Sequence, residues 1–493
     1  MTGDVLDLVY SNVIDILSLL QPVAVITAWL VICQGLAQSL IYLAQLVLAY
    51  RALRHGPPPR VGRALWWDYS DVVMPIALLV PAYNEEATIG ESIRSMLSLQ
   101  YPNFEVIVIN DGSKDGTMDA LIAAFDLKPM VRPYDEAMKH RPIQGMYGSP
   151  RHSNLLVIDK ENGGKSDALN AGINVSRAPL FCAVDADSLL EPDSLLRAVQ
   201  PFIDDPYRVV AVGGTIRVVN GCEVRNGRVV RTGLPRRILP LFQTIEYLRA
   251  FLMARLAWSE LNALTIISGA FGIFRRSVAV EVGGYTHGTV GEDLEIIIKI
   301  HRWMHEHGQH YRIRFIPEPV CWTEAPESLR VLARQRMRWQ RGALETLYRH
   351  RDMILNRRYG RVGMLGLGNA LLTDVLGPPC EMVGYLLVPL FWATGALSLE
   401  FLVAYLALTF VFGICISVGS LMLEELELRR FSRARDLFVL TLAAVLENFG
   451  YRQLNNIWRV GGFIQWLRGA QAWGAMTRRG FKKTETTEEL RET

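Results

Sequence analysis

Cysteine is scarce and dispersed in this sequence. The 493 residues include six cysteines, and no two of them form a CxxC pair. This spacing excludes a disulfide framework and gives no indication of a thiolate zinc site. The nine histidines include no HExxH motif, and we assign the group formed by His301, His305, His307 and His310 to a helix surface and the turn after it.

A strong charge of either sign is also lacking. The net charge is +3, with 52 basic and 49 acidic side chains, so a nucleic-acid footprint is not indicated. The first 20 residues contain three aspartates and no basic residue, and we expect no cleaved signal peptide. The chain has no internal repeat and is too long for one small domain.

Apolar residues are in excess at the two ends of the chain. Residues 23–50 carry no charge and are numerous enough to span a bilayer with some tilt, although a buried soluble helix is the alternative. Arginines follow this segment and aspartates precede it. This distribution predicts that the amino terminus lies outside the cytoplasm and that the domain after the helix is cytoplasmic.

The carboxyl-terminal part of the chain predicts further membrane helices. Residues 371–397 are mostly apolar but contain two adjacent prolines and two acids, whereas residues 401–423 carry no charge. Residues 424–436 are expected to be a charged connector. Residues 437–457 are expected to be half of a spanning helix or a re-entrant element, and a basic interfacial helix and tail are expected over 458–493.

Between these ends, short apolar strands alternate with helices. Strands are predicted over residues 75–80, 104–110, 155–158 and 180–184, with helices over 87–99, from 118, and over 166–175. This alternation favours an open, mostly parallel, Rossmann-like sheet whose ligands bind beyond the carboxyl ends of the strands. Two polar segments, 128–153 and 220–237, are expected as loops, the second with a hairpin turn at Asn226–Gly227.

Acidic side chains follow the predicted strands. Asp185 and Asp187 flank one small residue at a strand end and could bind Mg²⁺ or Mn²⁺ together with substrate phosphates, although an isolated DxD is also a common acidic turn. Asp111 could accept hydrogen bonds from a base or ribose, or form an Asx turn favoured by Gly112. Glu85 could instead be an ordinary acid at a helix start.

Three further motifs suit a polyphosphate and a sugar. The sequence Asn162-Gly163-Gly164-Lys165-Ser166 resembles a phosphate cradle but is not a Walker A loop. Asp293, next to Glu292, is a candidate general base, with a helix cap as the alternative. Gln335-Arg336-Met337-Arg338-Trp339 offers arginines for phosphate and an indole for a sugar ring, whereas a basic membrane-surface helix would explain the charge alone.

Found together in this order, the motifs resemble those of membrane-embedded family 2 glycosyltransferases, a type that includes cellulose, hyaluronan, chitin-oligosaccharide and poly-N-acetylglucosamine synthases. The resemblance covers residues 75–345 through motifs and the flanking helices through architecture. It implies an α/β GT-A fold, an inverting mechanism, a UDP-sugar donor and Mg²⁺ or Mn²⁺. No recognisable cyclic-dinucleotide-binding domain follows the catalytic region, unlike in bacterial cellulose synthase.

The resemblance also implies roles for individual residues. Asp293 would be the base beside Glu292, and Asp187 would bind the metal with Asp185. Ser268 and Gly269 lie in the acceptor-side loop, which is nearer to the aminosugar-polymer and hyaluronan forms than to the cellulose form. The residues that would contact the donor are Tyr83, Glu85, Asp111, Lys165, Asp185, Gln335, Arg338 and Trp339, of which Trp339 would also contact the acceptor.

The resulting expectation is processive transfer from a UDP-sugar to a β-linked polysaccharide, coupled to translocation across the cytoplasmic membrane. An accessory membrane or periplasmic export subunit is a possible partner. The alternatives are a non-processive transferase acting on a lipid carrier and an inactive membrane scaffold. The expected organisation is a membrane segment (1–55), a linker (56–74), a cytoplasmic GT-A domain (75–330), interfacial helices (331–365), membrane helices (366–457) and a tail (458–493).

Overall fold

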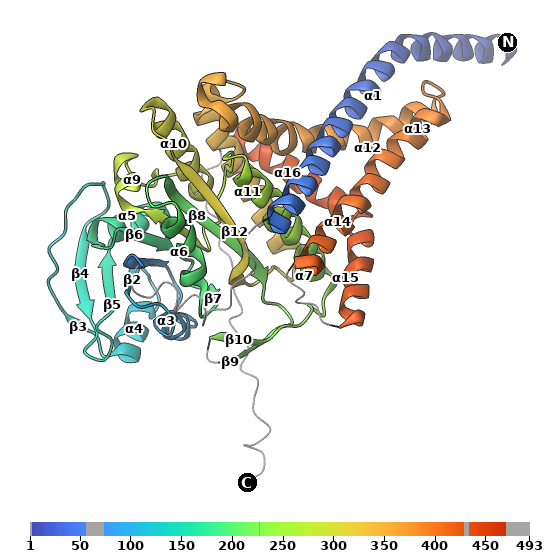
Figure 1. The fold of residues 1–493 in the computed structure, drawn as a ribbon. Coiled ribbons are helices and arrows are strands. Elements are labelled where there is room, and N and C mark those ends of the chain that lie inside the picture. Colours follow the sequence, from blue (N-terminus) through green and yellow to red (C-terminus); the bar gives the residue numbers. More distant parts are fainter. Residues whose placement is uncertain (1, 56–72, 226, 428–432, 470–493) are drawn as a thin grey trace.

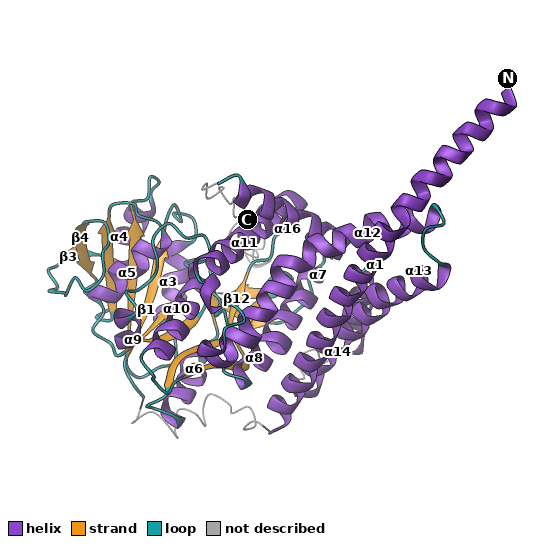
Figure 2. Ribbon diagram, turned by 90° about the horizontal axis from the view of Figure 1, so that it is seen from above, coloured by secondary structure: helices purple, strands orange, loops and turns teal. Residues whose placement is uncertain are grey.

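The computed structural model describes residues 2–55, 73–225, 227–427 and 433–469. Figures 1 and 2 both show two parts side by side, an α/β part that holds the sheet and a part built only of helices. Most of the predicted linker therefore lies outside the described residues, as does the end of the predicted tail.

One 10-stranded sheet forms the centre of the α/β part, with the strand order β3-β4-β5-β2-β1-β6-β11-β8-β12-β7. Its strands are β1 (Ile76–Ala82), β2 (Phe104–Asp111), β3 (Lys128–Pro129), β4 (Ile143–Gly148), β5 (Leu155–Lys160), β6 (Leu180–Ala183), β7 (Leu189–Leu190), β8 (Val209–Val218), β11 (Gly272–Arg275) and β12 (Arg312–Thr323). Strands β5, β2, β1 and β6 run parallel, and β11 returns antiparallel to β6. The predicted parallel core is confirmed.

Helices cover this sheet because its central strands are apolar on both faces. The side chains of β6 are all buried, and every residue of β1 except Pro81 is buried. The helices of the α/β part are α3 (Ile89–Leu97), α4 (Thr117–Phe125), α5 (Lys165–Val175), α6 (Ser194–Asp204), α9 (Arg276–Glu281) and α10 (Glu292–Glu306). The carboxyl ends of β1, β2 and β6 therefore meet at one edge, where the predicted motifs begin.

Both segments expected as loops contain strands, so that expectation was wrong. Strand β4 pairs antiparallel with the outer edge of β5, and β3 pairs with β4. Strands β9 (Glu223–Arg225) and β10 (Arg228–Arg231) form a hairpin. Gly227 has a positive φ of 69°, which suits the tight turn, while Asn226 lies outside the described residues. Such short edge strands can form from polar sequence because little of their surface must be buried.

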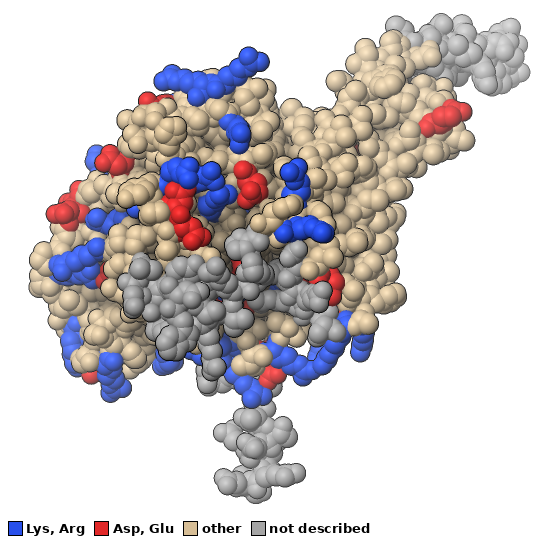
Figure 3. Space-filling view, in the orientation of Figure 1, with Lys and Arg blue, Asp and Glu red and all other residues tan. Residues whose placement is uncertain are grey.

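Three helical segments are long and apolar enough to cross a membrane, namely Gln21–His55, Val362–Ala393 and Leu399–Leu426. They contain most of α1 (Thr2–His55), together with α12 (Gly377–Ala393), α13 (Leu399–Leu406) and most of α14 (Phe412–Glu427). Pro378 and Pro379 are at the start of α12, directly after the π-helical segment Ala370–Leu376, so they lie inside the apolar segment Val362–Ala393. Figure 3 shows few charged side chains on this helical arm and many on the α/β part.

The carboxyl-terminal region differs from its predicted division. Gly450, with a positive φ of 98°, separates α15 (Ala434–Leu446) from α16 (Tyr451–Leu467). The range 437–457 is therefore not one element, and the helix that covers the first part of the expected interfacial region begins at Tyr451 rather than near 458. Residues 424–427 of the expected connector belong to α14, where Glu424 is fully buried and paired with Arg217 at the end of β8.

The remaining helices join the two parts. They are α7 (Ile238–Tyr247), a π-helical segment (Leu248–Arg255), α8 (Leu256–Glu260) and α11 (Leu329–Arg349). Helix α16 packs along α11, and α1 packs against α8, α12 and α14. The assignment of His301 to a helix surface was wrong. His301 is fully buried, and its ring contacts the Tyr311 hydroxyl and the Leu264 carbonyl.

Candidate active site

The loops that follow β1 and β2 are joined by hydrogen bonds. The Asn84 backbone N–H donates to Ser113 Oγ at 3.0 Å, and Asn84 Oδ1 accepts from the Lys114 backbone N–H at 2.8 Å. Tyr83 precedes this junction and is 44% exposed, so its ring is available to a ligand. Glu85 lies just before α3, where its Oε2 accepts a hydrogen bond from the Thr88 hydroxyl at 3.1 Å. This contact matches the helix-start alternative for Glu85.

Asp111 is almost fully buried and organises the glycine turn of the predicted phosphate cradle. Its carboxylate accepts the backbone N–H groups of Gly163 at 3.0 Å and Gly164 at 2.7 Å. Lys160 Nζ lies 2.6 Å from carboxylate oxygens of both Asp111 and Asp167. Asp111 therefore fixes the loop that precedes Lys165.

Sequence analysis did not identify Lys160, which is fully buried. A lysine at the end of a predicted buried strand, next to a glycine turn, is the signal that could have indicated it. A buried ammonium needs acidic partners, and the predicted motifs contain acids in suitable places.

Lys165 links two motifs that are far apart in the sequence. Its Nζ lies 2.6 Å from Asp185 Oδ1, just beyond β6, and 3.1 Å from Glu292 Oε1 at the start of α10. Burial opposes the charged form of Lys165, but the carboxylates of Asp185 and Glu292 outweigh this effect and raise its pKa. Gly269 permits the approach of the acceptor-side loop, because a Cβ there would lie 2.8 Å from Lys165 Nζ.

Asp293 lies in the same cavity as Lys165, Ser268 and Gly269. Its Oδ1 accepts the Leu294 N–H at 2.9 Å, and its Oδ2 is 3.4 Å from the Gly269 nitrogen. Burial and the neighbouring charge of Glu292 raise the pKa of Asp293 to about 6, while Lys165 and Arg255 act in the opposite direction. A carboxylate with this pKa is mostly ionised at neutral pH and is still basic enough to accept a proton.

Arg255 is a second residue that sequence analysis missed. Its guanidinium lies over the Phe251 ring, 3.8 Å from the ring centroid, and its Nη1 is buried without a hydrogen-bond partner among the described residues. Burial lowers its pKa to about 10, and the charge of Asp293 partly offsets this shift. Arg255 ends the segment Leu248–Arg255, which also contains Arg249, and arginines spaced in this way give no distinctive sequence pattern.

Helix α11 lies beside the first turn of α10 because two glycines meet there. A Cβ on Gly342 would lie 2.9 Å from the Gly291 nitrogen, which excludes a larger residue without movement. On α11, Trp339 is 46% exposed and Arg338 is half-buried. The side-chain oxygen of Gln335 is buried and has no hydrogen-bond partner among the described residues, so a ligand hydroxyl could satisfy it.

Asp185 and Asp187 are suitable ligands for a hard divalent cation. Both are half-buried and lie in the turn after β6. Mg²⁺ and Mn²⁺ prefer oxygen ligands and commonly complete their shells with substrate phosphates and water. Among the described residues, no group of three or more His, Cys, Asp or Glu side chains could hold a metal.

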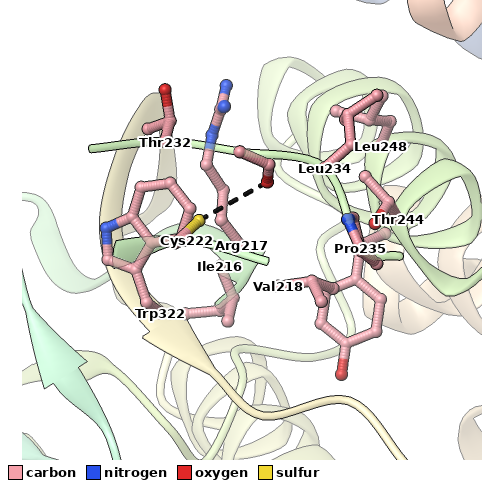
Figure 4. A pocket seen from close by; sticks show the side chains of 12 residues that line it. Ile216, Arg217, Val218, Cys222, Thr232, Leu234, Pro235, Thr244, Leu248 and Trp322 are labelled. Carbon is pink, nitrogen blue, oxygen red and sulfur yellow. Dashed lines mark hydrogen bonds between the residues drawn. The ribbon is translucent and has the colours of Figure 1, made fainter. Parts of the chain in front are cut away.

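A second pocket lies away from these residues, between β8, β12 and α7 (Figure 4). Its lining includes Arg217, Cys222, Thr232 and Trp322, and Cys222 Sγ contacts the Gly233 carbonyl at 3.7 Å. The pocket contains none of the predicted site residues.

The family assignment rests on residues 77–283, which match the model of glycosyl transferase family 2. These residues belong to that family. The matched range runs from β1 to α9 and includes Asp111, Lys165 and Asp185. The resemblance to family 2 and the GT-A fold that it implied are confirmed.

Among curated proteins, the chain is similar to poly-β-1,6-N-acetyl-D-glucosamine synthases of Staphylococcus epidermidis and Staphylococcus aureus, with 30% identity over 275 residues in each case. The match covers 56% of this chain and 56% of each relative, so the chain spans about half the length of the curated relatives it matches. Among solved structures, a Pyrobaculum calidifontis mannosyltransferase in complex with GDP-Man and Mn²⁺ has 19% identity, with a TM-score of 0.49 over 86% of this chain and 99% of that one.

Proposed function

We propose that the chain is an inverting, processive glycosyltransferase that adds sugars from a UDP-sugar to a growing β-linked polysaccharide. The observation that carries this proposal is that Lys165 pairs with Asp185 and Glu292 and lines one cavity together with Glu292 and Asp293. The exposed Trp339 lies on α11, whose Gly342 packs against Gly291 directly before Glu292. The names of the sequence relatives support N-acetylglucosamine as the first sugar to test and a β-1,6 linkage as the first product to seek.

The proposed reaction is a single displacement. Asp293 accepts the proton of an acceptor hydroxyl, and that oxygen bonds to the anomeric carbon of the donor sugar. The bond between the anomeric carbon and the diphosphate oxygen breaks on the opposite face, so UDP leaves and the configuration inverts. Arg338 would bind diphosphate oxygens, while Lys165 holds Asp185 and Glu292 in position.

Asp185 and Asp187 would hold Mg²⁺ or Mn²⁺ with the diphosphate. When bound, the ion supplies positive charge that offsets the charge developing on the leaving UDP. Tyr83, exposed directly after β1, would contact the uridine, whereas the buried Asp111 at the end of β2 would act through the glycine turn that it holds.

The membrane placement is part of the same proposal. The three apolar segments would lie in the cytoplasmic membrane, with the catalytic part on the cytoplasmic side. The growing chain would pass from Trp339 along the flanking helices, and an accessory membrane or periplasmic subunit could receive it.

A donor panel tests the proposal. Membranes containing the protein receive labelled UDP-sugars with Mg²⁺ or Mn²⁺, and products are sized and digested with linkage-specific hydrolases. We expect a long β-linked polymer from one donor and none from the Asp293→Asn variant. Addition of a single sugar to a lipid would instead identify a non-processive transferase, and absence of transfer from every donor would refute an active enzyme.

A further inference from the structure

The arginine-rich motif of α11 contains one arginine that is not placed for a substrate. Arg336 is 3% exposed, and its Nη2 lies 2.6 Å from Glu246 Oε2 on α7. The same carboxylate oxygen accepts a hydrogen bond from the hydroxyl of Tyr451, on α16, at 2.7 Å. One carboxylate therefore connects three helices that are distant in the sequence.

Arg336 also contacts Trp339. Its guanidinium carbon lies 4.4 Å from the centroid of the indole ring, on the same helix and one turn earlier. A guanidinium at this distance covers one face of the ring and attracts its electrons. Trp339 is 46% exposed, and the ring face away from Arg336 is therefore available to a ligand.

Helix α16 supports this arrangement through close packing. A Cβ on Gly462 would lie 2.6 Å from the Met337 carbonyl oxygen, between Arg336 and Arg338 in the sequence. Arg459 Nε donates to Gln340 Oε1 at 2.8 Å, directly after Trp339. The backbone on both sides of Trp339 is thus held by a helix from the far end of the chain.

We propose that Glu246, Arg336 and Tyr451 form a positioning clamp that fixes the Trp339 ring for an acceptor glycan and so sets how long the product stays bound. The inference rests on the proposed function, because it needs Trp339 to contact the acceptor. Arg336 is a positioning residue here, since it acts through Trp339. A planar guanidinium can pair with Glu246 and cover the indole at once, whereas a lysine ammonium cannot reproduce both contacts.

The test compares product length with nucleotide affinity in the full chain. Arg336→Lys, Glu246→Gln and Tyr451→Phe are assayed with UDP-N-acetylglucosamine, and UDP binding is titrated separately. If the clamp holds Trp339, acceptor release becomes faster and mean product length falls by at least about two- to fivefold, the factor expected for loss of one cation–π contact with a partly exposed ring. UDP affinity should stay within about twofold, because the clamp does not touch the nucleotide side. The matched controls are Arg330→Lys and Tyr348→Phe, two exposed side chains of the same helix.

The possible outcomes separate this inference from the proposed function. Normal product length in Arg336→Lys and Glu246→Gln, together with short product in Trp339→Ala, would overturn the clamp and leave the function intact. Full-length product from Trp339→Ala would refute the acceptor role of Trp339 itself. If Arg336→Lys loses UDP binding through misfolding, Tyr451→Phe decides, because it removes one hydroxyl only. Unchanged product length in that variant would overturn the clamp.

Discussion

The pH dependence of transfer should report the ionisation of Asp293. Burial and Glu292 raise its pKa to about 6, and the proposed base works only when it is deprotonated. The rate under subsaturating donor should therefore fall as pH decreases through 6. About nine tenths of Asp293 is ionised at pH 7 and slightly less than one tenth at pH 5, which predicts about a tenfold loss between these values.

The fall in rate at low pH is the acidic limb of the pH–rate profile. Two substitutions next to Asp293 should move this limb in opposite directions. Glu292→Gln removes a negative charge that raises the pKa of Asp293, so the limb should move to lower pH. Lys165→Met removes a positive charge that lowers the same pKa, so the limb should move to higher pH. Both residues also contact each other, so each variant is first checked for UDP binding.

The assay is initial-rate transfer from pH 5 to pH 9 at constant ionic strength and metal concentration. Asp293→Asn should lose about 10²–10⁴-fold in rate while keeping UDP affinity, because other residues hold the nucleotide. A flat profile down to pH 5, or shifts of the same sign in the two neighbouring variants, would refute the assignment of Asp293 as the base.

Three further results are expected. EDTA should abolish transfer and Mg²⁺ or Mn²⁺ should restore it, with Asp187→Asn losing turnover more than folding; full activity in chelator would contradict the metal assignment. Single cysteines can replace Asp4 or Arg151 in a variant that lacks the exposed Cys33 and Cys415. The two positions should be labelled from opposite sides of the membrane, and labelling of both from the same side would contradict the topology. Lys160→Met should cost about 3–5 kcal/mol in unfolding free energy by leaving Asp111 and Asp167 unpaired, and an unchanged thermal transition would contradict the role of that buried cluster.

The parallel core was predictable because its signal is local. Strands such as β2 contain a continuous apolar run, and Asp111 or another acid lies at the end of each strand or within a few residues after it. Parallel strands that share a sheet bring their carboxyl ends together, so the sequence order alone placed the acids at one edge. The edge strands β3 and β4 lacked this signal because they are short and carry exposed polar residues.

The buried charges were not predictable in the same way. Lys160, Arg255 and Glu424 read as ordinary polar residues in the sequence, and only the folded contacts show that each is buried in a charged or aromatic environment. A buried charge is tolerated when a partner from another element lies beside it. Such partners can be far apart in sequence, as Arg217 and Glu424 are, so no local pattern identifies them.

The two arginines of the α11 motif show how helical spacing divides one short sequence between two tasks. Gln335, Arg338, Trp339 and Gly342 are spaced at i, i+3, i+4 and i+7, which places them along one face. Gly342 meets Gly291 at the start of α10, so this face is the one beside the catalytic cavity.

Arg336 and Gln340 are spaced at i and i+4 on the adjoining face, where they contact Glu246 and Arg459. The division follows from the 100° turn between residues, and it is consistent with the proposed substrate contact of Arg338 and the proposed supporting role of Arg336. Exchanging the roles would require rotating α11, which the Gly342 and Gly462 contacts on its two sides oppose.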